Sequence, residues 1–198
     1  LALLLREVGI CPERALADEA IAAVKNGLDA PFGMFAYILL FTGLRRGELL
    51  ALRYEDIDRE NKTITVNKSV TYLGNTASLK LPKTKNGIRT VDLLDNLLSV
   101  LPDGSGYIFS MPDGKPLTKT AYRKRWAKYC NAIGYEITAH QLRHGYATLL
   151  YEAGIADKDA QELLGHSNIT TTRNVYTHIR QSHREERTQK LNDYIGKL

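Results

Sequence analysis

The segment Thr138–His144 groups basic side chains in the order Thr-Ala-His-Gln-Leu-Arg-His. Thr138 and Gln141 fit a capping box, in which both side chains bond free backbone N–H groups, so a helix is predicted to begin at Thr138. His140 and Arg143 are three residues apart and would be neighbours on its first turns. Because free N–H groups and the positive end of the helix dipole lie there, the pair predicts a site for an anion such as a phosphate. The alternative is a solvated helix face.

Three further residues are suited to phosphate chemistry. Arg45 follows Thr-Gly-Leu in a turn between two predicted helices, and a guanidinium can hold a phosphate through two parallel hydrogen bonds. His166 follows Leu-Leu-Gly at a predicted helix end, and Tyr176 comes ten residues later. Each also has an ordinary interpretation: a surface arginine, a cation near the negative end of a helix dipole, and one of eleven tyrosines in a core or on a surface.

The order of these motifs is more specific than any one of them. Thr-Gly-Leu-Arg at 42–45, His-Gln-Leu-Arg-His at 140–144, Leu-Gly-His at 164–166 and Tyr-Thr-His at 176–178 resemble the motifs of the tyrosine recombinases, or phage-integrase family. The resemblance extends over about residues 13–180. The residues that match the family's catalytic set are Arg45, His140, Arg143, His166 and Tyr176.

The family also uses a lysine on a β-hairpin, and this sequence offers two such lysines. Lys83 begins the Lys-Thr pair that the resemblance favours, whereas Lys85 lies closer to the predicted turn. We take Lys83 as the catalytic lysine and keep Lys85 as the alternative. The other interpretation is that both are solvated hairpin lysines.

The resemblance implies a role for each residue that agrees with its physical chemistry. Arg45 and Arg143 would bind the non-bridging phosphate oxygens and stabilise the extra charge of the transition state without a metal. Tyr176 would be the nucleophile, and because a tyrosine has a pKa of about 10, a neighbour must remove its proton. His140 is the candidate for that step, and His166 would hydrogen-bond the phosphate. The hairpin lysine would protonate the leaving 5′ oxygen.

The implied product is a 3′-phosphotyrosine, which conserves the energy of the phosphodiester bond, so that resealing needs no ATP. The sequence contains no Gly-x-x-x-x-Gly-Lys-Ser/Thr motif, which agrees with this. The function expected is that of a site-specific DNA recombinase, or integrase, that cleaves and rejoins strands during integration or excision of a phage or mobile element. Neither a cofactor nor a metal is expected.

Three other functions fit part of the pattern. A type IB topoisomerase uses the same chemistry to relax DNA, and a non-catalytic helical domain would use the basic residues only to bind the DNA backbone. A metal hydrolase is the third, because His140 and His144 are four residues apart, as in zinc-binding helices. Gln141 stands where such a helix needs a glutamate, which argues against the metal site.

Helices and a small sheet must position these residues. Apolar spacing predicts helices over residues 13–26, 32–41 and 46–52, and Gly43 is expected to cap the second. Extended runs predict strands at 63–66, 78–83 and 88–93. Asn86-Gly87 predicts a hairpin turn between the last two strands.

The second half of the chain is predicted to be helical after a loop-rich segment at 102–116. Its helices are expected over residues 118–133, 139–153, 157–164 and 170–176, and from 180 onward. The fold class is therefore mixed α+β, mainly α-helical with a small three-stranded antiparallel sheet. The resemblance implies the tyrosine recombinase catalytic-domain fold.

The chain is expected to contain three parts. Residues 1–12 would be the remnant of a linker from a missing N-terminal DNA-binding region, 13–180 the catalytic domain, and 181–198 a C-terminal tail helix. The apolar stripe of the tail consists of Leu191, Tyr194, Ile195 and Leu198. This stripe would pack either on its own domain or on a neighbouring protomer.

Composition fits a DNA-binding protein of the cytoplasm. The chain has 198 residues, enough for one sizeable core, and a net charge of +5, which suits a nucleic-acid partner. Cys11 and Cys130 make no disulfide framework, and no membrane segment is expected. The expected partners are double-stranded DNA and further copies of the chain, as a tetramer on DNA, whereas the free chain would be mainly monomeric.

Overall fold

The computed structural model describes residues 18–82 and 88–195. The helices within these ranges are α2 (Asp18–Asn26), α3 (Gly33–Thr42), α4 (Arg46–Ala51), α5 (Asp95–Leu98), α6 (Lys119–Ile133), α7 (Ala139–Glu152), α8 (Asp157–Leu164) and α9 (Ile169–Ile195), with a 3-10 turn η1 (Tyr54–Asp56). The strands are β1 (Ile57–Asp58), β2 (Thr63–Val66), β3 (Ser69–Leu73), β4 (Thr76–Lys80) and β5 (Arg89–Asp92). None of the helices described is both long and apolar enough to cross a membrane.

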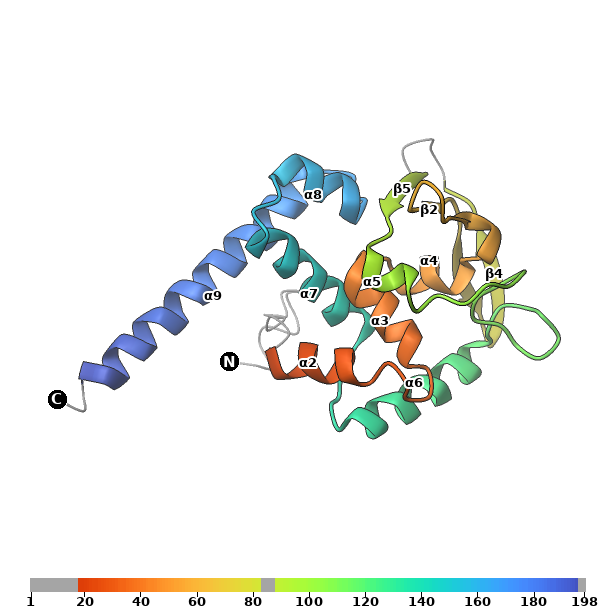
Figure 1. Cartoon of the computed structure of the whole chain (residues 1–198), viewed down its shortest axis with the longest axis horizontal. Helices are drawn as coiled ribbons and strands as arrows, with labels where there is room; N and C mark the ends of the chain where they lie inside the picture. The colour runs from red at the N-terminus through yellow and green to blue at the C-terminus, as the bar shows by residue number, and fades with distance from the viewer. Residues whose placement is uncertain (1–17, 83–87, 196–198) are drawn as a thin grey trace.

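Helix α3 lies at the centre of the fold because it is apolar on all sides. Eight of its ten residues are buried, and it packs against α2, α4 and α7 (Figure 1). An aromatic cluster packs at its N-terminal end and is formed by Phe32, Phe35, Phe109, Tyr122 and Trp126. This core holds the turn at the other end of α3, where Arg45 lies.

The strands form two small antiparallel sheets. The predicted three-stranded sheet is present, with β2 between β1 and β5, but the prediction that the strand at 78–83 belongs to it is wrong for residues 78–80, and residue 83 lies outside the described part. Instead, β4 pairs with β3 through the two-residue turn Gly74–Asn75. That pairing closes a shorter loop than a pairing of β4 with β5 would, and therefore costs less chain entropy. The predicted turn at Asn86-Gly87 lies outside the described residues.

Most of the predicted helices are confirmed. α3, α4, α6, α7 and α8 begin and end within one or two residues of the predicted bounds, and residues 13–17 of the first predicted helix lie outside the described part. The short helix α5 was not predicted. The break predicted between residues 176 and 180 is wrong, because α9 continues through it as one helix of 27 residues. No glycine or proline interrupts that stretch.

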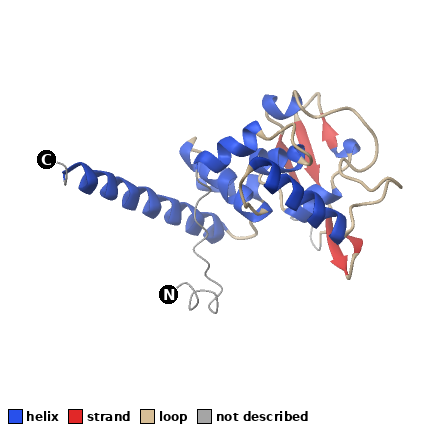
Figure 2. Cartoon of the chain, turned by 90° about the horizontal axis from the view of Figure 1, so that it is seen from below, coloured by secondary structure: helices blue, strands red, loops and turns tan. Residues whose placement is uncertain are grey.

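A second, smaller core joins the last three helices. It contains Tyr146, Ala147, Leu150, Ala160, Leu164, Tyr176 and Ile179. These residues come from α7, α8 and the first part of α9, which packs on the other two helices. The rest of α9 projects away from the body of the molecule (Figures 1 and 2).

Gly43 offers a test of how tightly the turn after α3 is packed. It caps α3 with φ +61°, and a Cβ added to it would overlap the ring of Tyr146. Gly134 caps α6 with φ +73° but has open space around its Cα, so it is a matched control. We expect Gly134→Ala to cost about 1–2 kcal/mol of unfolding free energy through backbone strain. Gly43→Ala should cost about 1–3 kcal/mol more because of the overlap. Urea denaturation measures both, and equal losses would contradict the packing.

Candidate active site

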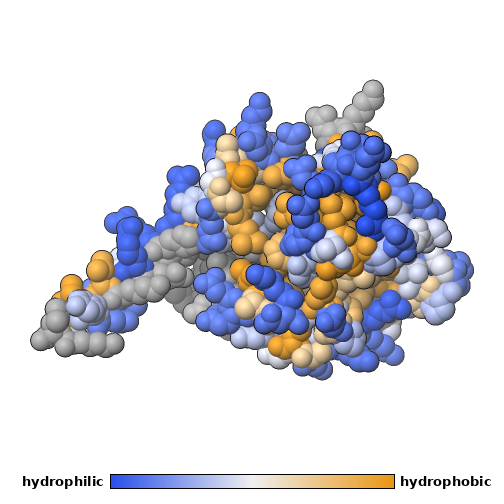
Figure 3. All heavy atoms as spheres, in the orientation of Figure 1, coloured by the Kyte–Doolittle hydropathy of each residue, from blue (hydrophilic) through white to orange (hydrophobic). Residues whose placement is uncertain are grey.

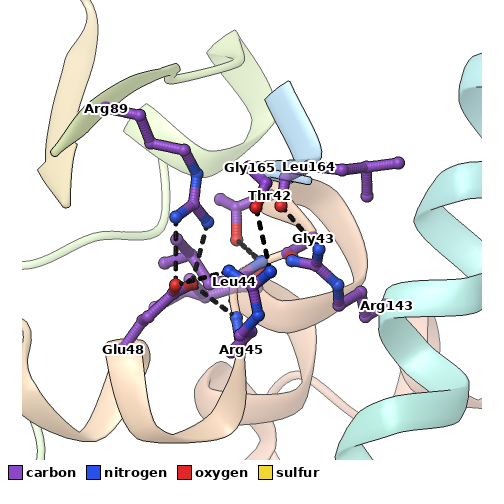
Figure 4. A network of polar contacts seen from close by, with 10 residues as sticks. Thr42, Gly43, Leu44, Arg45, Glu48, Arg89, Arg143, Leu164 and Gly165 are labelled. Atoms are coloured by element: carbon purple, nitrogen blue, oxygen red, sulfur yellow. Dashed lines mark hydrogen bonds and ion pairs between the residues drawn. The ribbon is translucent and has the colours of Figure 1, made fainter. Parts of the chain in front are cut away.

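Arg45 lies where α3 and α4 meet. It is the N-cap residue of α4, and its side chain is 47% exposed. Its Nη1 donates to Glu48 Oε1 at 2.9 Å, and its Nη2 donates to the carbonyl of Gly165 at 2.9 Å, just after α8 (Figure 4). The backbone N–H of Arg45 also donates to Glu48 Oε2 at 2.8 Å. Arg45 is thus fixed from two sides while part of its guanidinium stays open to solvent.

Arg143 lies beside Arg45 but is buried. It belongs to the second turn of α7, whose capping box between Thr138 and Gln141 is confirmed. The residue is 7% exposed, and its guanidinium donates to the carbonyls of Gly43 and Leu164 (Figure 4). Burial, and then the nearby cation of Arg45, lower the pKa of Arg143 to about 9. It therefore stays protonated at neutral pH.

The C-terminal end of α8 brings the two arginines together. Leu164 and Gly165 present their carbonyls to Arg143 and Arg45, respectively. The last carbonyls of a helix have no partner within it and form the negative end of its dipole. They attract cations for that reason, and two guanidiniums from distant parts of the chain converge on them.

His166 follows this helix end directly. Its backbone N–H donates to the carbonyl of Gln161 at 3.0 Å, and its Nδ1 lies 2.9 Å from the hydroxyl oxygen of Thr172 in α9. Burial, and then the cations of Arg143 and Arg45, lower the pKa of His166 to about 4. The ring is therefore neutral at pH 7 and offers one hydrogen-bond donor and one acceptor.

His140 lies in the first turn of α7, one turn before Arg143. It is exposed, and its ring meets that of His144 edge to face with 4.8 Å between the centroids. Within the described ranges, no group of three or more His, Cys, Asp or Glu side chains is arranged to hold a metal ion.

Glu48 and Arg89 belong to the same network, although the sequence analysis missed both. Arg89, the first residue of β5, donates to both carboxylate oxygens of Glu48, at 3.0 and 2.8 Å (Figure 4). Glu48 is buried, and its contacts with Arg89 and Arg45 lower its pKa to about 2 against the opposing effect of burial. Glu48 had a local signal, since it stands three residues after Arg45 at a helix start. Arg89 had none.

The hydroxyl of Tyr176 contacts Ile155 in this structure and not the arginines of the site. Its side chain is buried in the second core, and its hydroxyl donates to the carbonyl of Ile155 at 3.4 Å. Its ring meets that of Tyr151 edge to face, 5.2 Å between centroids. Burial, and then the carboxylate of Asp157, raise the pKa of Tyr176 to about 12. Thr172, one turn earlier on α9, does reach the site through His166.

The two candidate lysines, Lys83 and Lys85, lie outside the described residues. The chain on either side of them borders the site, because a pocket of about 240 Å³ is lined by both ends of that segment. Its lining includes Lys80, Leu81 and Pro82 on one side and Arg89 on the other, together with Arg45, Glu48 and Gly165.

The cluster carries a surplus of positive charge. Arg45, Arg89 and Arg143 contribute three guanidiniums, against the single carboxylate of Glu48. Each guanidinium has five N–H donors, and the contacts described for Arg45 and Arg143 use two on each side chain. An anion with several oxygens, such as a phosphodiester, matches both the charge and the free donors.

The sequence itself matches a known family over most of its length. A sequence model of the phage integrase family matches residues 17–183. The chain belongs to the phage integrase family. The family resemblance carried by the four motifs is therefore confirmed.

Similar curated proteins carry related names. The tyrosine recombinase XerC-like protein of Caldanaerobacter subterraneus subsp. tengcongensis is 35% identical over 89% of this chain and 53% of that protein. The ICEBs1 integrase of Bacillus subtilis is 32% identical over 83% of this chain and 49% of that protein. This phage-integrase chain thus spans about half the length of these relatives.

Solved structures confirm the predicted tyrosine recombinase catalytic-domain fold. The Tn1549 transposon integrase in complex with circular intermediate DNA matches with a TM-score of 0.72 and 24% identity, over 89% of this chain and 68% of that one. The XerH site-specific recombinase bound to difH substrate, a pre-cleavage complex, matches with a TM-score of 0.61 and 27% identity. That match covers 87% of this phage-integrase chain and 52% of the XerH chain.

The protonation of His166 can be measured directly. In the folded protein its ring should titrate near pH 4, below the ordinary 6.5, because burial and the neighbouring arginines disfavour the imidazolium. A pH series of NMR spectra follows the ring signal, and His166→Gln assigns it by its loss. A midpoint at or above 6.5 would contradict the described environment.

Proposed function

We propose that this member of the phage integrase family is the catalytic part of a site-specific DNA recombinase that cleaves and rejoins strands through a covalent 3′-phosphotyrosine. The observation that carries the proposal is the convergence of Arg45, Arg143 and His166 at the end of α8. The arrangement provides fixed cations and a neutral hydrogen-bonding ring around one point. These are the features that stabilise a phosphoryl transition state.

In the proposed reaction, Arg45 and Arg143 hold the non-bridging oxygens of the scissile phosphate. The hydroxyl oxygen of Tyr176 attacks phosphorus and forms the Tyr–phosphate bond while the bond to the 5′ oxygen breaks. His140 takes the tyrosine proton, and Lys83, or Lys85 in its place, gives a proton to the leaving oxygen. His166 hydrogen-bonds the phosphate. The reverse sequence rejoins a strand, so no external energy source is consumed.

Tyr176 must move for this reaction to occur. In the described structure its hydroxyl donates to the carbonyl of Ile155, so the side chain occupies a resting position. Its pKa is raised to about 12, so the hydroxyl keeps its proton at neutral pH. We propose that DNA binding shifts α9 so that the hydroxyl reaches the phosphate, where two arginines stabilise the tyrosinate. The weak contact with Ile155 costs only about 1 kcal/mol to break.

The proposed partner is double-stranded DNA, in the cytoplasm, with several protomers on one DNA assembly. The DNA complexes of the Tn1549 integrase and XerH support the DNA partner. The end of α9 supports docking between protomers, because Leu191, Tyr194 and Ile195 are 55–66% exposed. Apolar surface is visible there among hydrophilic side chains (Figure 3). Residues 13–180 would form the catalytic domain, 181–198 the exchanged tail of a tetramer, and 1–12 the link to an N-terminal DNA-binding region.

The nucleophile is tested by Tyr176→Phe. The variant lacks the attacking oxygen and should form no covalent adduct on a nicked suicide substrate, whereas wild type should do so in a denaturing gel. DNA affinity should be unchanged, and stability should fall by only about 0.5–1.5 kcal/mol, since one weak hydrogen bond is lost. Tyr151→Phe is the matched control, because that ring packs against Tyr176. An adduct with Tyr176→Phe would refute the assignment.

The phosphate clamp is tested by two alanine variants. Arg45→Ala should lower single-turnover cleavage about a hundredfold or more and leave the fold intact, because its side chain is half exposed. Arg143→Ala should lose as much activity and also destabilise the protein, since two buried carbonyls lose their donor. Arg46→Ala, an exposed neighbour that lies over the ring of Tyr122, is the control. Near-wild-type cleavage with Arg45→Ala would place the site elsewhere.

A further inference from the structure

Arg89 lies at the first position of β5, directly after the segment that contains both candidate lysines. It pairs with Val66 of β2 in the three-stranded sheet, and its side chain is 9% exposed. Its two terminal nitrogens form parallel hydrogen bonds with Glu48, at 3.0 and 2.8 Å. This two-pronged geometry fixes the orientation of both partners, which a single contact would not do.

Glu48 also bonds Arg45, so it connects Arg89 to Arg45. Its Oε1 accepts from the Nη1 atoms of both Arg45 and Arg89, and its Oε2 accepts from the Arg45 backbone and from Arg89 Nη2. Each carboxylate oxygen is therefore shared between the two arginines. The position of Arg45 depends on a carboxylate that Arg89 holds in place.

Arg89 also packs against the second anchor of Arg45. A Cβ added to Gly165 would lie 2.7 Å from Cζ and from Nε of Arg89, so the Arg89 side chain packs closely against this glycine. The carbonyl of the same glycine accepts from Arg45 Nη2. Arg89 thus touches both groups that fix the Arg45 side chain: the Glu48 carboxylate and the end of α8 (Figure 4).

We propose that Arg89 is a positioning residue for strand cleavage, which holds Glu48 and Gly165 so that Arg45 is ready to receive the scissile phosphate. The inference rests on the proposed function and adds a residue to it. Arg89 acts through Arg45 and does not itself bind the phosphate, because the Glu48 carboxylate holds both of its terminal nitrogens, whereas those of Arg143 bond only neutral carbonyls.

The network predicts a pH signature, because Glu48 must stay ionised to hold Arg45. Contact with Arg89 is the largest influence that lowers the pKa of Glu48, and burial opposes it. Without Arg89 that pKa should rise, and protonation of Glu48 would then weaken its bond to Arg45 as the pH falls. Among the residues that the structure describes, the charged groups near Glu48 include Arg45 at the start of α4, Arg89 on β5, Arg143 on α7, and Lys68 and Lys80 in the adjoining pocket.

The first experiment measures single-turnover cleavage of a suicide DNA substrate at saturating protein between pH 5 and pH 8. Arg89→Met should be about ten- to a hundredfold slower at pH 7, as misplacement of a catalytic group predicts, with DNA affinity close to wild type. Its deficit should grow toward pH 5. Arg89→Lys keeps the positive charge but cannot form the two parallel hydrogen bonds with Glu48, so its cleavage rate should be intermediate. Arg53→Met, which removes an exposed arginine paired with Glu55, is the control and should match wild type. If Arg89→Met cleaved at the wild-type rate at every pH, the proposal would be overturned.

A double-mutant cycle separates positioning from direct contact. If Arg89 acts through Glu48, then Glu48→Gln combined with Arg89→Met should cleave no more slowly than the slower single variant. Losses that multiply would show that Arg89 acts independently of Glu48 and would overturn a positioning role through that carboxylate. If Arg89→Met does not fold, Arg89→Lys replaces it in the cycle with the same two outcomes.

A last measurement does not depend on catalysis. The Glu48 carboxyl can be titrated by NMR in the DNA-free chain, with Glu48→Gln to assign the signal. The wild-type pKa should lie near 2, and it should rise in the Arg89 variant. An unchanged pKa would overturn the network whether or not the chain cuts DNA. If the pKa shifts as expected but the wild-type chain forms no covalent adduct, the proposed function is refuted while the coupling of Arg89 to Glu48 is still supported.

Discussion

The arrangement of the site depends on one buried arginine. Arg143 belongs to α7, yet its guanidinium bonds the carbonyl of Gly43 after α3 and that of Leu164 at the end of α8. Burying a cation is costly unless its donors are satisfied, so the three elements can lie only where those carbonyls meet it. Helix ends leave such carbonyls free. The contacts that join the helices are therefore the same contacts that place two arginines side by side.

The balance of charge explains why the site suits an anion. Arg45, Arg89 and Arg143 lie around Glu48, whose carboxylate offsets only one of the three charges, and the carbonyls of α8 contribute partial charges. Burial, and then the repulsion that remains, lower the pKa of Arg143 and of His166. A bound phosphate would relieve it. Glu48 limits the repulsion and leaves a net positive charge that suits an anion.

Local chemistry in the sequence predicted the parts of the site that local chemistry determines. The capping box at Thr138 and the glycine cap at Gly43 need only neighbouring residues, whereas the family and its fold came from the resemblance carried by the order of the four motifs. The bond between Arg89 and Glu48 joins residues 41 positions apart and has no periodic signal, so only the fold reveals it. The partner of β4 was missed for another reason: residues 69–73 were not predicted as a strand, and the turn at Gly74–Asn75 was not considered.

The resting position of Tyr176 follows from the same physics that built the second core. A tyrosine ring contributes much to a small apolar cluster, and burial raises its pKa to about 12, which would suppress the proposed nucleophile where no phosphate is present. Moving the hydroxyl toward the arginines would lower the pKa of Tyr176 again, because nearby cations favour the tyrosinate. Thr172 ties the start of α9 to His166, so the required motion must leave or stretch that contact. In the proposed reaction, the reactivity of Tyr176 would thus be coupled to the position of α9.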